Sequence, residues 1–185
     1  MKLINIFSYV LLAVLLSSCD NGGTDPKPVD PSIVINKAGL LTVNETWNAD
    51  SIYVLTGRFV IDAGVTLTIE PGTIIKGKEG DCANASVLIV SKGGLIDAQG
   101  TADQPIVMTS VLDNINVGQR NGSNLDEPDK GLWGGLIILG DAPISANAST
   151  SLIEGLPANE PWAEYGGSNP TDNSGTITYM SVRHG

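Results

Sequence analysis

The feature that most constrains the fold of this chain is a series of short apolar segments that recur in a fixed order, with glycine-containing turns between them. Residues 58–61, 65–69 and 73–76 are three such segments. The same order returns at residues 87–98 and 105–109, which is an offset of about thirty residues. A period of this length indicates stacked structural repeats.

A third copy of the pattern follows an insertion. It covers residues 135–144, and Ile153 together with residues 176–182 continues the series. Short strands with one apolar face cannot bury that face alone, but strands stacked as coils pair with their copies above and below. A sandwich of hairpins is the alternative, but the Asn-Gly or Asp-Gly turns typical of hairpins are missing between these strands. The sequence therefore predicts an all-β fold, a parallel β-helix (solenoid).

The composition agrees with many short strands. Glycine is abundant, with 22 residues, while aromatic residues make up only 5% of the chain. Val, Ile, Leu and Thr carry the apolar content, which favours strands and tight turns over helices. The net charge of -10 repels phosphate-rich molecules, so we expect no nucleic acid partner. No sequence feature calls for a cofactor.

The N-terminus has the pattern of a signal peptide. Lys2 supplies a positive charge, residues 3–16 are apolar, and a pair of serines precedes Cys19. The segment resembles bacterial lipoprotein signal peptides, which implies that the thiol of Cys19 receives a diacylglyceryl group and that Cys19 becomes the acylated first residue. A transmembrane helix is the alternative, but the stretch is shorter than the roughly 20 apolar residues that a bilayer core requires. We expect a signal peptide over residues 1–18.

A flexible tether follows the lipidated cysteine. Residues 19–35 are rich in Pro, Asp and Gly, which prevents a helix or a packed strand and keeps the segment extended. Because two or more acyl chains hold a protein durably on a membrane, the folded domain itself needs no membrane affinity. The expected layout is a lipid anchor in the bacterial cell envelope, at the outer membrane, then the tether, then a β-helix domain over residues 36–185. The sequence leaves open whether the domain faces the periplasm or the cell exterior.

The repeats also carry a family resemblance. The residues that carry it are 64–75, 93–110 and 133–140, with shorter matches at 153–155, 165–167 and 172–175. They resemble a group of bacterial surface lipoproteins with a right-handed parallel β-helix, related in fold to pectate lyases. The resemblance implies a right-handed coil that continues past residue 185. Since no capping segment follows Val182, and an uncovered last coil exposes unpaired backbone, we expect a C-terminally truncated fragment.

Two polar insertions interrupt the coil. The first, residues 111–131, contains four acidic residues, Asp113, Asp126, Glu127 and Asp129. Hard cations such as calcium bind clustered carboxylates, but the regular ligand spacing of a calcium loop is absent, so a solvated acidic loop is the favoured interpretation. We predict no metal site.

The second insertion, residues 155–175, is the candidate binding loop. Trp162 and Tyr165 could form an apolar platform for a sugar ring, and Glu164 and Asp172, with Glu160, could accept its hydroxyl hydrogen bonds. The alternative is that Trp162 packs on the coil as a lid. Long loops on rigid scaffolds often bind ligands, so a glycan is the candidate ligand and a polysaccharide or another surface protein the expected partner.

Catalysis has little support in the sequence. Cys82 lacks a nearby histidine, and His184 is the only histidine of the chain, which leaves no histidine-based triad. We expect Trp133, beside Gly134, to begin a strand and cover the coil. The prediction is a binding or structural module with no catalytic residues. The alternative is a polysaccharide lyase or glycoside hydrolase whose active coils are missing or lie in residues 111–131 and 155–175.

Overall fold

The computed structural model describes residues 33–80, 84–155 and 160–185. The predicted signal peptide, the lipidation site Cys19, most of the predicted tether and Cys82 lie outside these residues. The described chain is built from strands and one short 3-10 helix, η2 (Pro161–Ala163). The strands are β1 (Ile33–Leu41), β2 (Glu45–Trp47), β3 (Ser51–Ile61), β4 (Thr66–Ile69), β5 (Ile74–Gly77), β6 (Val87–Val90), β7 (Leu95–Gln99), β8 (Ile106–Ser110), β9 (Leu136–Ile138), β10 (Ser151–Leu152), β11 (Glu164–Tyr165), β12 (Gly175–Thr178) and β13 (Met180–Val182).

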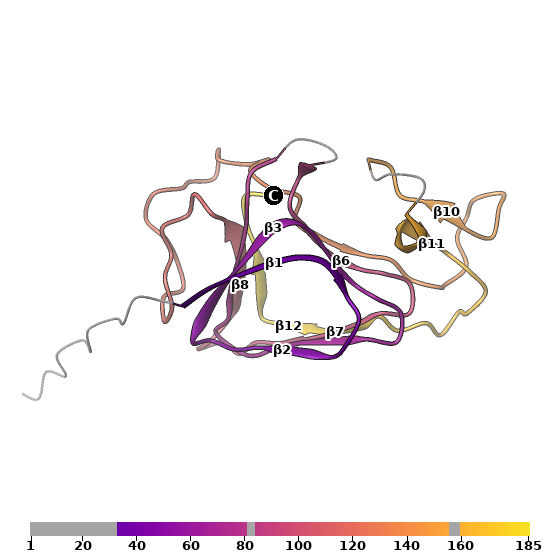
Figure 1. Ribbon diagram of the computed structural model, residues 1–185, viewed down its shortest axis with the longest axis horizontal. Coiled ribbons are helices and arrows are strands. Elements are labelled where there is room, and N and C mark those ends of the chain that lie inside the picture. Colours follow the sequence, from indigo (N-terminus) through magenta and orange to yellow (C-terminus); the bar gives the residue numbers. More distant parts are fainter. Residues whose placement is uncertain (1–32, 81–83, 156–159) are drawn as a thin grey trace, which may run out of the picture.

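The strands wind into a three-sided column of parallel coils (Figure 1). The first face is formed by β5, β8 and β13, stacked on the first halves of β1 and β3. The second face is formed by β6 and β9, stacked on the second halves of the same two strands. The third face contains β2, β4, β7 and β12 in that order. The parallel pairing confirms the parallel β-helix and excludes the hairpin sandwich.

Equivalent residues of successive coils stack into rows that fill the column. One interior row runs Leu41, Ile61, Val90, Ile138 on the second face. The third face supplies Trp47, Ile69, Ala98, Ile177, and the first face supplies Tyr53, Ile75, Met108, Val182. Apart from the last member of each row, these side chains form one buried apolar cluster. Each coil therefore closes the interior of its neighbours.

The predicted period is confirmed where no insertion intervenes. Val60 pairs with Ile89, and Leu67 pairs with Ile96, so both offsets agree with about thirty residues. The column begins earlier than the sequence pattern indicated, because β1 starts at Ile33, inside the segment assigned to the tether. β1 and β2 form a complete first coil whose apolar residues are too irregularly spaced to be recognised as a repeat.

Two other predictions were wrong. Ile153 does not continue the coil, since it follows β10, which pairs antiparallel with β11 in a separate two-stranded sheet outside the column. Trp133 does not begin a strand, since β9 starts at Leu136. Its indole is 3% exposed and lies within the interior cluster, where its N–H donates to the carbonyl of Arg183 at 2.8 Å.

Each insertion packs on the outer surface of the column. The first insertion covers an outer cluster on the first face that includes Ile74 and Ile115. The second insertion covers an outer cluster on the second face that includes Ile89 and Leu139. In Figure 1 the two insertions project to opposite sides of the three-sided coil; the second carries β11 and η2, and β10, just before it in the chain, pairs with β11. Each insertion therefore shares a small apolar cluster with the outer side of the column.

Candidate functional site

The second insertion is held on the column by apolar contacts with the outward side chains of the second face. Val60, Val87 and Ile89 point away from the interior and are buried beneath the insertion. Trp162, in η2, and Tyr165, in β11, pack against this outer cluster and are both half-buried. The cluster fixes where β10 and β11 lie relative to the edge of the second face.

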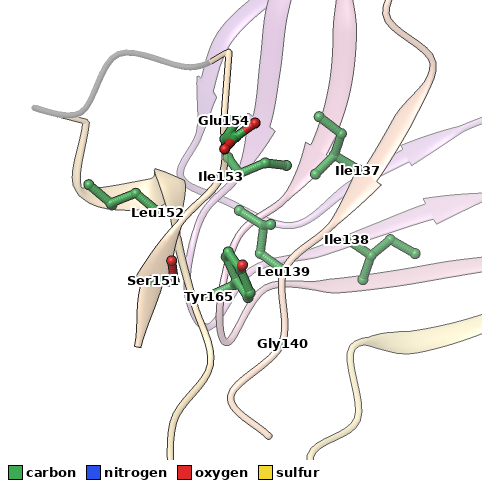
Figure 2. Close-up of a pocket in the computed structure, with 9 residues that line it drawn as sticks. All are labelled: Ile137, Ile138, Leu139, Gly140, Ser151, Leu152, Ile153, Glu154 and Tyr165. Atoms are coloured by element: carbon green, nitrogen blue, oxygen red, sulfur yellow. The ribbon is translucent and has the colours of Figure 1, made fainter. Parts of the chain in front are cut away.

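An open groove of about 470 Å³ lies between β9 and β10. Figure 2 shows the two chain segments side by side, with Leu139, Ile153 and Tyr165 between them. Most of its lining residues are apolar, but its surface is as polar as it is apolar, and Glu154 supplies a carboxylate at one end. The groove is lined by Ile137, Ile138, Leu139, Gly140, Ser151, Leu152, Ile153, Glu154 and Tyr165. A groove that combines apolar residues with polar groups can hold a small amphipathic ligand.

A lysine from the column ties the second insertion in place. The ammonium of Lys92 donates to Glu164 Oε1 at 2.6 Å and to the carbonyl of Gly166 at 3.3 Å. It also lies 3.8 Å from Asp141 Oδ1. The hydrogen bond from Lys92 lowers the pKa of Glu164, and a second hydrogen bond from Thr150 lowers it further. The same Glu164 hydrogen bond raises the pKa of Lys92.

The four predicted glycan-binding residues gather on one flank of the column, but they do not share one surface. Only Tyr165 lines the groove. Trp162 packs against the outer cluster, as the lid interpretation expected. Glu164 is engaged by Lys92, and Asp172 Oδ2 accepts the backbone N–H of Asp141 at 2.9 Å. Both carboxylates hold the loop, which leaves Tyr165 as the residue of this set best placed to meet a ligand.

The sequence did not point to most of the groove. Ile137 and Ile138 belong to a strand that reads as another repeat, and Ser151 and Leu152 lie in a polar, unpatterned stretch. Glu154 supplies the carboxylate of the groove. The only sequence feature that drew attention to Glu154 was the family resemblance at residues 153–155. The groove lies between β9, which pairs with β6, and β10, which pairs with β11. Two strands that do not pair with each other leave no periodic pattern in the sequence that would predict a groove between them.

The comparison with protein families agrees with the observed architecture. The model of the pectate-lyase-like β-helix domain matches residues 39–185, which is most of the chain. The chain belongs to this family. No curated protein and no solved structure matched the chain. Membership of the family accounts for the coil, and it leaves the ligand of this β-helix domain to be argued from the groove and the insertions.

A second pocket of the β-helix domain joins the first insertion to the C-terminal segment. It has a volume of about 370 Å³ and is lined by Asp113, Asn121, Gly122, Leu125, Asp126, Glu127, Arg183 and His184. Three of the four acidic residues singled out in the sequence, Asp113, Asp126 and Glu127, therefore lie in one pocket with Arg183 and His184, which are distant in sequence. Among the residues that the structure describes, no group of three or more His, Cys, Asp or Glu side chains could hold a metal ion.

Asp113 has a structural task at the base of this pocket. It is 3% exposed, and its carboxylate accepts hydrogen bonds from the Thr109 hydroxyl at 2.9 Å and from the Ile115 N–H at 3.0 Å. The ammonium of Lys76 donates to the Asp113 carbonyl at 2.7 Å. Burial lowers the pKa of Lys76, and the charge of Asp113 opposes that shift. These buried polar contacts fasten the first insertion to the first face.

Within residues 33–80, 84–155 and 160–185, no helix has the length and hydropathy needed to cross a bilayer.

Proposed function

We propose that this β-helix domain is a lipid-anchored module of the bacterial cell envelope that binds a glycan in the groove between β9 and β10 and has no catalytic activity of its own. The observation that carries the binding proposal is the groove itself, which is open, presents polar and apolar surface alike and is bordered by Tyr165 and Glu154. An aromatic ring beside apolar walls suits the apolar face of a sugar, and a carboxylate at the margin can accept hydroxyl hydrogen bonds.

The anchor proposal rests on the sequence before the described residues. The apolar stretch over residues 3–16 and the small residues before Cys19 support lipidation at Cys19. Metabolic labelling with a fatty-acid analogue should mark the wild-type protein and should not mark Cys19→Ser. Equal labelling of both proteins would contradict the anchor. Protease treatment of intact cells then distinguishes an outer-membrane protein that faces the exterior from one that faces the periplasm.

A glycan array tests the groove directly. We expect the wild-type domain to bind and Tyr165→Ala to lose binding, because the alanine removes the ring that borders the groove. Leu112→Ala is the matched control, since Leu112 is an exposed apolar residue of the first insertion, outside the groove. Binding by Trp162→Ala shows whether Trp162, which packs on the outer cluster, contributes to glycan binding by holding the loop in place. Equal binding by Tyr165→Ala and Leu112→Ala would contradict the groove proposal.

A polysaccharide lyase or glycoside hydrolase is the second candidate, and one observation favours it. The pocket beneath the first insertion places Asp126 and Glu127 beside Arg183. Carboxyl and basic side chains are the groups that commonly transfer protons to or from a sugar substrate. Turnover of a polysaccharide, measured as new reducing ends or unsaturated products, with loss of turnover in Glu127→Gln, would replace the binding proposal with this one.

A further inference from the structure

A third pocket, of about 230 Å³, lies at the corner where the third face of the column turns into the first face. One wall comes from the turns that follow β2, β4 and β7, which stack on one another and supply Ala49, Asp50, Gly72 and residues 103–105. The other wall is residues 117–120 of the first insertion. We call this cavity the corner pocket.

The column side of the corner pocket is held by backbone contacts. The N–H of Gly72 donates to the carbonyl of Gln104 at 3.0 Å, and the N–H of Thr101 donates to the same carbonyl at 3.1 Å. Gly72 has a φ of +82°, a conformation that suits glycine. This wall therefore has a fixed shape that does not depend on mobile side chains.

The insertion side is fixed by Arg120 and Gln119. The Nη2 atom of Arg120 donates to the carbonyl of Asp103 at 2.7 Å and to Asp103 Oδ1 at 3.3 Å. Gln119 is tied to Asn116, whose N–H donates to Gln119 Oε1 at 2.8 Å. Both contacts of Arg120 use one nitrogen, and a guanidinium carries five N–H donors. The rest of the guanidinium can therefore donate to a ligand.

The polar groups of the corner pocket include both acceptors and donors. Asp50 and Asp103 supply carboxylates, which only accept hydrogen bonds, and Arg120 supplies a guanidinium, which only donates. Gln104 and Gln119 add amides, which do both. A sugar hydroxyl also donates and accepts, so it can pair with every one of these groups. Two carboxylates beside one guanidinium disfavour an anionic ligand.

The apolar groups and the size of the corner pocket limit the ligand further. Pro105 and Val117 supply apolar surface, and Val117 is fixed because it packs against the outer cluster of the first face. The volume of about 230 Å³ is below the range of about 300–1,000 Å³ that is usual for drug-sized ligands. A single ring with one apolar side and several hydroxyl groups meets these limits.

We propose that the corner pocket is a second sugar-binding site, which takes one neutral sugar ring and is separate from the groove between β9 and β10. This inference rests on the proposed function, because it takes the domain to be a glycan-binding module. The two insertions project to opposite sides of the column (Figure 1), so the two sites belong to different flanks. Two linked sites bind a glycan surface more tightly than either site alone, provided that both can be engaged together.

Saturation-transfer NMR of the detergent-solubilised full chain tests the corner pocket, with glucose, galactose, mannose and N-acetylglucosamine as probes. A single ring has few atoms with which to bind, so it is measured in solution and not on an array. In a Tyr165→Ala background, which weakens the groove, we expect binding of a neutral sugar to persist. Adding Asp50→Ala or Arg120→Ala should weaken that binding by about tenfold or more, the usual effect of removing a hydrogen bond to a charged group.

Lys130→Ala is the matched control, since Lys130 is an exposed cationic residue of the first insertion and does not line the corner pocket. It should leave sugar binding unchanged. Asp50→Ala keeps the test independent of the insertion's position, because Asp50 lies in the turn after β2 and its removal leaves the contact between Arg120 and Asp103 intact. Circular dichroism shows whether each variant keeps the strand signal.

The outcomes separate this inference from the proposed function. If Tyr165→Ala alone abolishes all sugar binding, the groove is a sugar site and the corner pocket is not. If Asp50→Ala abolishes all binding and Tyr165→Ala has no effect, the corner pocket stands and the groove proposal fails. A wild-type protein that binds none of the probes overturns both. In the Tyr165→Ala background, unchanged binding after Asp50→Ala and Arg120→Ala, or tighter binding of glucuronate than of glucose, overturns the corner pocket alone.

Discussion

At the scale of single residues, Gly77 lies directly against the buried ring of Trp133 inside the column. A Cβ atom on Gly77 would lie 2.4 Å from Cε3 of the buried Trp133 ring. We expect Gly77→Ala to lower the free energy of unfolding by about 1–3 kcal/mol, the usual cost of overpacking a core. Gly57→Ala is the control, since its Cβ would have no atom within 4 Å. Denaturant unfolding measures both, and equal effects would show that Trp133 moves aside freely.

At the scale of elements, the second insertion depends on the ion pair between Lys92 and Glu164. Because the pKa of Glu164 is lowered from 4.5, the native state binds this proton more weakly than the unfolded chain. The stabilisation is therefore present above about pH 4.5 and is lost as the pH falls through the native pKa. For Lys92 the pKa is raised from 10.5, so its contribution is present below that value and is lost as the pH rises through the native pKa.

Hydrogen exchange measures this element-scale effect. At neutral pH we expect amides of β10 and β11 to exchange faster in Glu164→Gln than in wild type, and the difference should vanish in acid below the native pKa of Glu164. Asp103→Asn is the control, since it removes a carboxylate of the exposed pair with Arg120, far from the second insertion in the sequence. A difference that persists unchanged into acid would contradict an electrostatic cause.

At the scale of the whole molecule, stability depends on interior rows that all coils share. Leu67 is fully buried in β4, between β2 and β7, while Leu40 points outward from the first coil and is 48% exposed. We expect Leu67→Ala to lower the free energy of unfolding by about 2–5 kcal/mol and Leu40→Ala to lower it much less. Hydrogen exchange should show lost protection in both β2 and β7 for Leu67→Ala, and loss confined to β4 would contradict shared stability between coils.

The candidate site was only partly predictable at any of these scales. Long polar insertions predicted where binding residues could gather, and Tyr165 does border the groove. Glu164 and Asp172 were predicted as ligand acceptors, yet their partners are Lys92 and the backbone of Asp141. Lys92 is distant from Glu164 in the sequence, and no local pattern encodes such a pairing. Which side chains are free to bind a ligand, and which ones hold the loop in place, could therefore be seen only in the folded structure.

The sequence by itself determined the parallel coil. Apolar strands that return with the same turns can satisfy their backbone hydrogen bonds and bury their apolar face only by stacking on their own copies. The tertiary structure decided what the repeats leave free: which apolar residues face inward, how each insertion packs on an outer face, and where the groove opens between β9 and β10. Those features come from contacts between segments far apart in the chain, and contact energies between such segments are fixed by three-dimensional packing and not by local periodicity.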